Sequence, residues 1–240
     1  MGERKERDDG APWRNFYGRR HGKTLRPTQE RHLAELLPQI APPGVAWAEN
    51  PDRAPVDFKA MVPGASEAWL EIGFGGGEHL IAMAKANPDV AMIGCEPFIN
   101  GVAMCLGAHE REGIANARIH AGDAREIFDV AADGAFTRIF VNYPDPWPKS
   151  RHHKRRFIGH DHLPHLSRVC ASGGRLHIAT DIPDYVRHSL EALAEFPEFR
   201  WTAEGPSDWR TPWSDWPSTR YEQKALREGR TPHYLTFIRA

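Results

Sequence analysis

Short apolar runs alternate with stretches of helical period from residue 68 onward, and this alternation is the feature that most constrains the fold. The runs are apolar almost throughout, which is typical of strands buried on both faces of a parallel sheet. We expect strands at 68–73, 89–96, 117–122, 136–142, 174–180 and 233–239. We expect helices near 77–87, 98–112, 159–171 and 184–195. The chain is therefore predicted to be an α/β protein whose last strand runs antiparallel at or near an edge.

The N-terminal part of the chain lacks this alternation. Residues 1–24 are rich in charge, Gly and Arg without a sustained period, and they predict a mobile arm. Residues 26–40 predict a helix with Thr28 as its N-cap. The apolar positions Leu33, Leu36, Leu37 and Ile40 fall on one face of that helix.

Residues 41–64 contain five prolines and predict a linker that lies on the surface. We therefore divide the chain into a basic arm, short helix and linker over 1–60 and one domain over 61–240.

Composition excludes several classes of protein. No uncharged apolar run reaches 18 residues, so a membrane-spanning helix is excluded. The N-terminus MGERKERDDG has no apolar stretch of the kind that directs secretion. The three cysteines, Cys95, Cys105 and Cys170, form no CxxC pair and lie in apolar segments. We expect buried thiols in a cytoplasmic protein, with no membrane, no metal and no obligatory protein partner.

Charge is strongly segregated along the chain. The formal net charge is −1, but residues 1–31 carry +4 and residues 146–157 carry +5, which leaves −10 on the rest. Concentrated basic segments on an acidic body commonly face phosphate backbones. The simpler interpretation, two solvated basic loops, stays open at this point.

Glycines follow the first predicted strand in the stretch Glu71-Ile72-Gly73-Phe74-Gly75-Gly76-Gly77-Glu78. Glycine there lets the backbone approach a ligand beyond the carboxyl ends of the strands. The dinucleotide fingerprint needs a third glycine at position 78, where this chain has Glu78. Two acids beside the glycines also disfavour a pyrophosphate and favour a cationic ligand. NAD is therefore disfavoured.

Two more acids follow the next strands. Glu96 ends the second strand, where a carboxylate can accept both hydroxyls of a ribose, and Asp123 follows the third. Each acid alone could be a helix N-cap or a turn residue. Three acids at successive strand ends beside the glycine loop favour a nucleoside-binding site. The glycine pattern resembles motif I of the S-adenosylmethionine-dependent methyltransferases, in which Asp123 would contact the adenine amino group.

The fourth strand ends in Asn142-Tyr143-Pro144-Asp145-Pro146-Trp147-Pro148 and continues into a basic run. Prolines make this loop extended and rigid, so Asp145 is held where the strand faces the cofactor. Trp147 is placed either to stack on a base or to pack the loop onto the sheet. The run supplies Lys149, Arg151, Lys154, Arg155 and Arg156, and we expect the last four to contact the phosphate backbone of a nucleic acid.

The stretch PDPWPKSRHHKRR closely resembles the signature of bacterial tRNA (guanine-N7-)-methyltransferases, and the resemblance covers roughly residues 14–240. It implies a Rossmann-like class I methyltransferase fold, with a mostly parallel seven-stranded sheet, helices on both faces and an antiparallel last strand. The domain over 61–240 would then be the methyltransferase domain. It also implies methyl transfer from S-adenosylmethionine to N7 of the variable-loop guanosine of tRNA, conventional position 46.

The resemblance also implies roles for individual residues. The cofactor-binding positions are Glu71, Gly73, Gly75, Glu96, Asp123 and Asp145, and Asp145 is also the expected catalytic residue. The substrate-binding positions are Lys149, Asp181, Thr219, Arg220, Tyr221 and Glu222. Which of Asp145, Asp181 and Glu222 stabilises charge and which recognises guanine stays open.

Four alternatives stand beside this interpretation. Methyltransferases of exocyclic amino groups resemble one another in an Asn/Asp-Pro-Pro-Tyr motif after the fourth strand, but Asp145 stands here in place of the aromatic residue. Another RNA or DNA base methyltransferase, or a non-catalytic RNA-binding module on the same fold, would also fit the basic segments. A metal site among the histidines near 152–165 is disfavoured, because Lys154, Arg155 and Arg156 would repel a cation.

Overall fold

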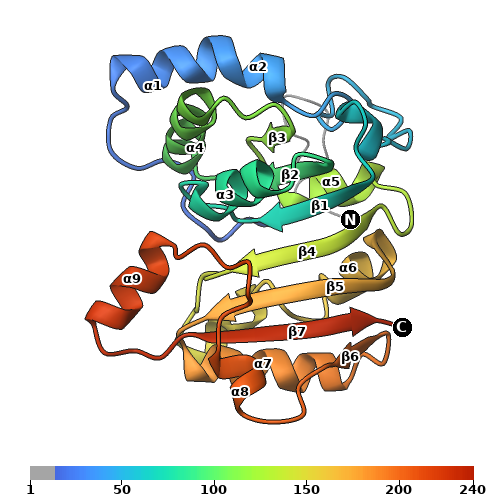
Figure 1. Cartoon of the computed structure of the whole chain (residues 1–240), viewed down its shortest axis with the longest axis vertical. Helices are drawn as coiled ribbons and strands as arrows, with labels where there is room; N and C mark the ends of the chain where they lie inside the picture. The colour runs from blue at the N-terminus through green and yellow to red at the C-terminus, as the bar shows by residue number, and fades with distance from the viewer. Residues whose placement is uncertain (1–13) are drawn as a thin grey trace, which may run out of the picture.

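Seven strands form one sheet in the order β3-β2-β1-β4-β5-β7-β6 across residues 14–240, the part of the chain that this computed structural model describes (Figure 1). The strands are β1 (Glu67–Ile72), β2 (Val90–Cys95), β3 (Ala117–His120), β4 (Phe136–Asn142), β5 (Cys170–Thr180), β6 (Phe199–Trp201) and β7 (His233–Arg239). β1 to β5 run parallel, so their carboxyl ends meet at one edge of the sheet. The predicted α/β class and mostly parallel sheet are confirmed.

The antiparallel strand β7 lies one position in from the edge, between β5 and β6. The expectation of an antiparallel last strand at or near an edge is therefore confirmed. The edge itself is β6, a strand of three residues that the apolar pattern did not reveal. Its backbone pairs only with β7, so its existence depends on a partner more than 30 residues later in the chain.

Helices cover both faces of the sheet, because alternate strand residues point to opposite sides. One face packs against α3 (Glu78–Ala86) and α4 (Ile99–Glu112), and the other against α5 (Ala124–Val130), α6 (Leu163–Val169) and α7 (Pro183–Ala194). Two short helices, α8 (Ser207–Arg210) and α9 (Arg220–Arg227), lie in the polar segment before β7. The three cysteines are buried and unpaired, as predicted.

The predicted helix over 26–40 is present, with an irregular middle. It consists of α1 (Pro27–Arg31), a π-helical turn η1 (His32–Leu36) and α2 (Leu37–Ile40). Leu33, Leu36, Leu37 and Ile40 pack into the core beside α4, which confirms the predicted apolar face. Thr28 as N-cap is wrong: Arg26 takes that position, because Pro27 has a fixed φ that suits the first turn.

Residues 41–64 do not lie wholly on the surface. Val45, Phe58 and Val62 are buried, and the ring of Phe58 lies 5.1 Å from that of Phe136 at the start of β4. A 3-10 turn η2 (Lys59–Met61) separates Phe58 from Val62. The surface prediction is therefore wrong at these positions, since prolines mark irregular backbone but do not exclude burial of the side chains between them.

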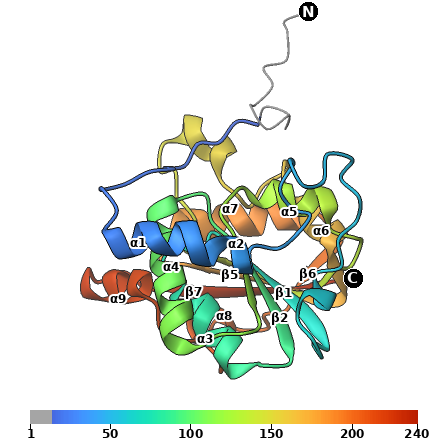
Figure 2. The same cartoon turned by 90° about the horizontal axis from the view of Figure 1, so that it is seen from above.

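Residues 14–25, here called the N-terminal strap, cross the molecule beside the 3-10 turn η3 (Ser150–Arg155) (Figure 2). Asn100 anchors the strap: its Oδ1 accepts from the Gly22 N–H at 2.7 Å and its Nδ2 donates to the Lys23 carbonyl at 2.6 Å. Arg14 pairs with Asp129 at 2.7 Å. The expected mobile arm is thus held against the body from residue 14 on, and residues 1–13 lie outside the described residues.

Candidate active site

The glycine loop leads from the carboxyl end of β1 into α3 and is wrapped closely by α4. Gly73, Gly75 and Gly77 all have φ in the left-handed region, at +71°, +58° and +81°. A Cβ at Gly77 would lie 2.4 Å from Sγ of Cys105, and a Cβ at Gly101 would lie 2.4 Å from the Gly75 carbonyl oxygen. Only glycine fits at these contacts, so the loop and the start of α4 form a closely packed rim.

Glu96 lies at the end of β2, as predicted, and fastens that strand to the glycine loop. One carboxylate oxygen accepts from the Gly75 N–H and the other from the Phe98 N–H, both at 2.8 Å. Burial raises the pKa of this carboxyl, and the two backbone N–H groups oppose that shift. Each oxygen keeps a lone pair, so a ligand hydroxyl can still be accepted at this position.

Asp123 is the N-cap of α5 and is already paired. Its side chain accepts from the backbone N–H of Arg125 at 2.9 Å, and the Arg125 guanidinium binds both carboxylate oxygens. Burial raises the pKa of Asp123, but these bonds outweigh it and hold the pKa below its usual range. Arg125 also donates to the backbone carbonyl of Asn15 in the N-terminal strap. The pair therefore connects the strap to the end of β3.

Glu71 faces a histidine that sequence reasoning missed. The carboxylate is buried at the end of β1 and accepts from Nδ1 of His79 at 2.8 Å. The His79 ring lies 4.8 Å from Phe140 and 5.1 Å from Trp216. Glu71 thus lies beneath the loop within an aromatic cluster. The only sequence signal for this pair was a histidine in the first turn of α3, close to the glycines.

Asp145 occupies the loop after β4, between two prolines, and is the acid of the site that has no partner. Across residues 14–240 its carboxylate accepts no hydrogen bond and forms no ion pair. Partial burial raises the pKa of this carboxyl, and the charge of Arg19 in the N-terminal strap opposes the shift. More than a third of the residue is exposed, so we expect it to be ionised at neutral pH.

Glu222 is buried and connects the segment before β7 to β7 itself through hydrogen bonds. It accepts from Nε1 of Trp216 at 2.9 Å, from the Ser218 hydroxyl at 2.5 Å and from the hydroxyl of Tyr234. Thr219 is the N-cap of α9 and accepts from the Glu222 N–H at 3.2 Å. These two predicted substrate positions therefore also build the start of α9, which lies beyond the carboxyl ends of β4 and β5 (Figure 1).

Arg220 and Tyr221 extend from α9 onto the glycine loop. The Arg220 Nε lies 3.1 Å from Oε1 of Glu78. The Tyr221 ring lies parallel to that of Tyr143 at 6.3 Å and covers Gly75, where a Cβ would be 3.2 Å from the ring. The structure therefore brings the predicted substrate residues into contact with the predicted cofactor loop.

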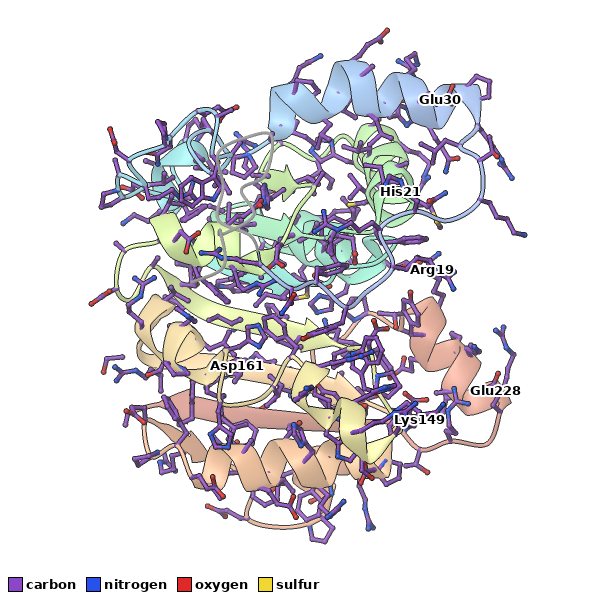
Figure 3. The ribbon with its side chains drawn as sticks, turned by 180° about the vertical axis from the view of Figure 1, so that it is seen from behind. Arg19, His21, Glu30, Lys149, Asp161 and Glu228 are labelled. Carbon is purple, nitrogen blue, oxygen red and sulfur yellow. The ribbon has the colours of Figure 1, made fainter. Side chains whose placement is uncertain are left out.

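Asp181 and Lys149 differ in whether their side chains already have a partner. Asp181 follows β5, is buried, and accepts from Nε of Arg230. Lys149 is exposed and lies on the same side of the molecule as Arg19 and α9 (Figure 3). The side chain of Lys149 is thus available to a large substrate, whereas Asp181 is engaged.

The basic run divides into exposed and anchoring residues. Arg151 and Lys154 are exposed on η3. The Arg155 guanidinium lies over the rings of Tyr17 and Trp147, at 4.7 Å and 5.0 Å from the ring centroids. Trp147 therefore packs between the loop and the N-terminal strap. Among the described residues, the ring contacts of Trp147 are thus with the N-terminal strap and η3, and not with the sheet on which the packing alternative placed it.

The prediction that Arg156 contacts a phosphate is wrong, because its side chain is buried. Its side chain is 1% exposed, and it donates to the Pro146 carbonyl at 2.9 Å and to the Asp184 carboxylate at 2.5 Å. The bond from Arg156, together with one from Arg187, lowers the pKa of Asp184 to about 2. Since the guanidinium points inward, Arg156 anchors the proline-rich loop to α7 and does not meet solvent. Four neighbouring cations look alike in sequence, and only the position of Asp184 singles this one out.

Asn142 and Tyr143 complete the floor of the site. The N and O atoms of the Asn142 side chain are both buried and have no hydrogen-bond partner across residues 14–240. Tyr143 has φ +49°, a left-handed conformation that costs a residue with a large side chain about 1–3 kcal/mol. Unpaired buried amides and such backbone strain concentrate at functional sites.

The donor set fits a nucleoside ligand that carries a positive charge. Gly73 of the glycine loop, the carboxylates of Glu71 and Glu78 and the unpaired amide of Asn142 line one small cavity. Glu96 lies beside it, bound to the Gly75 N–H. Among residues 14–240, no group of three or more His, Cys, Asp or Glu residues is arranged to hold a metal ion. No helix of the described part is long and apolar enough to cross a membrane.

Comparison with known proteins identifies close relatives. A family model described as "putative methyltransferase" matches residues 65–235. A tRNA (guanine-N(7)-)-methyltransferase of Ruegeria sp. (strain TM1040) is 59% identical over 96% of this chain and 89% of the relative. The protein of the same name from Jannaschia sp. (strain CCS1) is 57% identical over 94% of each chain.

Solved structures share the fold at low sequence identity. The 16S rRNA methyltransferase KamB is 15% identical, with a TM-score of 0.54 over 76% of this chain and 93% of that one. An antibiotic-related methyltransferase is 10% identical, with a TM-score of 0.51 over 75% and 92% of the two chains. The sheet and its helices are therefore those of a methyltransferase fold.

Proposed function

The chain belongs to the tRNA (guanine-N(7)-)-methyltransferase family, and on that premise we propose that it transfers a methyl group from S-adenosylmethionine to N7 of the variable-loop guanosine of tRNA. The observation that carries the proposal is the joining of the glycine loop, Asp145 and the start of α9 in one site, next to exposed basic residues. This arrangement accommodates a charged nucleoside and a polyanion at once.

The reaction requires little covalent chemistry from the protein. When bound, S-adenosylmethionine supplies a methyl group on a positively charged sulfonium. Guanine N7 has an in-plane lone pair and carries no proton, so no general base is needed to expose it. The chain must therefore bind both reactants, align them and stabilise the charge that passes to the purine.

The cofactor positions follow the order of the strands. We assign the ribose hydroxyls to Glu96, whose carboxylate is fixed by two backbone bonds at the end of β2. Gly73 and Gly75 allow close approach of the ligand over β1, and Glu71 places negative charge beneath it. Asp123 would accept a hydrogen bond from the adenine amino group, through carboxylate lone pairs that Arg125 does not use.

Asp145 is our candidate for the residue that stabilises the transition state. It is the acid of the site without a partner, on a loop that two flanking prolines make rigid. Asp181 and Glu222 are already engaged by Arg230 and by three neutral donors. A carboxylate that is free and oriented in advance can face the charge that develops on the purine.

We place the target base beside Tyr221, an exposed ring that lies parallel to the ring of Tyr143 beneath it. A base must be unstacked to reach such a pocket, and aromatic rings stabilise the extruded base. Lys149, Arg151 and Lys154 would contact the tRNA backbone nearby, with Arg155 held by the N-terminal strap. Phosphate contacts of this kind position an RNA without reading its sequence.

One assay tests the proposal. The full chain is incubated with labelled S-adenosylmethionine and either a tRNA with guanosine in the variable loop or the same tRNA with adenosine there. The tRNA is then digested to nucleosides and analysed. We expect 7-methylguanosine from the first tRNA only. An N-methylated exocyclic amino group, or tRNA binding without any product, would contradict the proposal.

A further inference from the structure

Helix α9 has few buried residues to fix its position. Six of its eight residues are exposed, and only Glu222 and Ala225 are buried. In Figure 1 the helix stands apart from the sheet, beyond the carboxyl ends of β4 and β5. The contacts of its first turn therefore decide where the exposed ring of Tyr221 lies.

Arg220, in that first turn, connects α9 to the other half of the site. Its Nε lies 3.1 Å from Oε1 of Glu78, the first residue of α3. Its Nη1 donates to Sδ of Met104 on α4 at 3.4 Å, and a thioether sulfur is a weak acceptor. One side chain thus reaches across the glycine loop to both helices beside it. These two contacts are here called the Arg220 bridge.

The guanidinium of Arg220 also lies closely over the glycine loop. A Cβ at Gly76 would be 2.3 Å from Nη2 and 2.8 Å from Cζ of Arg220. Unlike Gly75 and Gly77, Gly76 has no left-handed φ, so its own backbone does not require glycine. A side chain there would have to displace the guanidinium, and Gly76 therefore leaves room for the Arg220 bridge.

The Arg220 bridge determines the place of the neighbouring ring. Tyr221 covers Gly75, where a Cβ would lie 3.2 Å from the ring, and Cζ of Arg220 lies 5.5 Å from the centroid of the same ring. Tyr221 and Glu78 both line the small cavity of the site. A contact that fixes the first turn of α9 thus also fixes the ring that we placed beside the target base.

We propose that Arg220 is a positioning residue, whose bridge to Glu78 and Met104 holds Tyr221 over the glycine loop and couples the binding of cofactor and tRNA. This inference rests on the proposed function. The glycine loop belongs to the cofactor site and α9 to the tRNA site. A ligand that orders one side of the bridge reduces the cost of ordering the other side. Each ligand then strengthens binding of the other by the same factor.

A direct contact between Arg220 and a tRNA phosphate is the competing role. The side chain is 40% exposed, but its Nε and Nη1 are directed to Glu78 and Met104. The carboxylate of Glu78 would also repel a phosphate brought to the same guanidinium. The two roles differ in what removal of the Glu78 charge does. It weakens a bridge, whereas it frees Arg220 for a phosphate.

Calorimetry on the full chain tests the coupling. The dissociation constant of S-adenosylhomocysteine is measured without tRNA and with a saturating unmodified tRNA that has guanosine in the variable loop. The ratio of the two constants is the coupling factor, and it cancels any direct effect of a variant on cofactor binding. The variants are Glu78→Gln, Arg220→Gln and the two together. The matched control is Arg227→Gln, an exposed cation on the same helix.

We expect a coupling factor of at least about five for the wild type. Each single variant should lower it by about two- to fivefold, the range measured for exposed ion pairs. The double variant should lower it no further than one single variant, because both changes remove the same interaction. Arg227→Gln should keep the coupling factor of the wild type.

Other outcomes overturn the proposal. An unchanged coupling factor in Arg220→Gln with weaker tRNA binding, or tighter tRNA binding in Glu78→Gln, would mean that Arg220 binds a phosphate. Additive effects in the double variant would mean that the two residues act separately. If the wild type forms 7-methylguanosine with a coupling factor of one, only this inference fails. If it binds no S-adenosylhomocysteine and forms no 7-methylguanosine, the proposed function fails and this inference fails with it.

Discussion

Replacing His177 by Phe should make the fold less sensitive to acid. His177 lies on β5 and is 5% exposed. Its ring stacks on that of Phe140 at 5.1 Å and meets that of Trp213 edge-to-face at 4.6 Å. Burial, together with the charges of Arg138 and Arg175, lowers the pKa of its imidazole from 6.5 to about 3. The ring is therefore neutral in the folded state and charged in the unfolded state at mildly acidic pH.

The size of the effect follows from that difference in pKa. Between pH 6.5 and 3 the unfolded chain binds one more proton at this position, so the free energy of unfolding falls as pH falls through this range. Each pH unit below 6.5 costs about 1.4 kcal/mol, which gives about 2 kcal/mol at pH 5. For a chain of this size that loss corresponds to about 4–8 °C in Tm.

Urea unfolding of the wild type and of His177→Phe at pH 8, 6.5 and 5 measures the effect. Phe keeps the aromatic packing and cannot be protonated, so the variant should gain about 2 kcal/mol on the wild type between pH 8 and 5. The matched control is His160→Gln, because His160 has a side chain that is 73% exposed. That control should follow the wild type at every pH. Parallel curves for His177→Phe and the wild type would refute the reasoning.

Asp145→Asn keeps the shape of the side chain but removes its charge, and we expect single-turnover methylation to fall about 10²–10³-fold with little change in tRNA affinity; a rate near that of the wild type would remove the catalytic assignment. Charge reversal at Arg151 and Lys154 should weaken tRNA binding and reduce its salt dependence by about one unit of slope per lost phosphate contact, as measured in a salt titration. Arg156→Ala should leave that slope unchanged and lower the free energy of unfolding by about 2 kcal/mol, because its buried hydrogen bonds are lost; a changed slope would return Arg156 to the RNA surface. Glu96→Ala should weaken S-adenosylhomocysteine binding at least about tenfold in calorimetry; wild-type affinity would exclude Glu96 from the ribose site.

The order of strands and helices was predictable because burial on both faces leaves a direct trace in the residues. Leu70 and Ile72 belong to one core and Trp69 to the other, so the strand had to be apolar on both sides. The three residues of β6 leave no comparable trace. They form a strand because β7 offers an unpaired edge there, and that edge exists only after the sheet has assembled.

The candidate site was predictable in its positions but not in its pairings. Sequence placed Glu96, Asp123 and Asp145 after successive strands, and the structure brings the three to one edge. The sequence could not show that Arg125 pairs with Asp123 while Asp145 has no partner among the described residues. Both acids have cations within a few residues, so their spacing does not distinguish them. Pairing depends on side-chain geometry, which the spacing of residues does not encode.

Asn142 shows the same limit from the opposite side. It was visible as the first residue of the proline-rich stretch after the fourth strand, yet no role followed from its type or position. Its importance comes from the absence of a partner, and an absence can be seen only when every neighbour has been placed.

The position of β7 has a consequence for the order in which the molecule assembles during synthesis. β7 pairs with β5 on one side and β6 on the other, so the edge of β5 away from β4 stays uncovered until β7 leaves the ribosome. α9, which bears Arg220 and Tyr221, lies just before that strand and reaches the glycine loop only then. A nascent or truncated chain would thus form its first five strands while α9 was still missing from the site. Pairing of β7 would then be the last step before the molecule can bind both of its substrates.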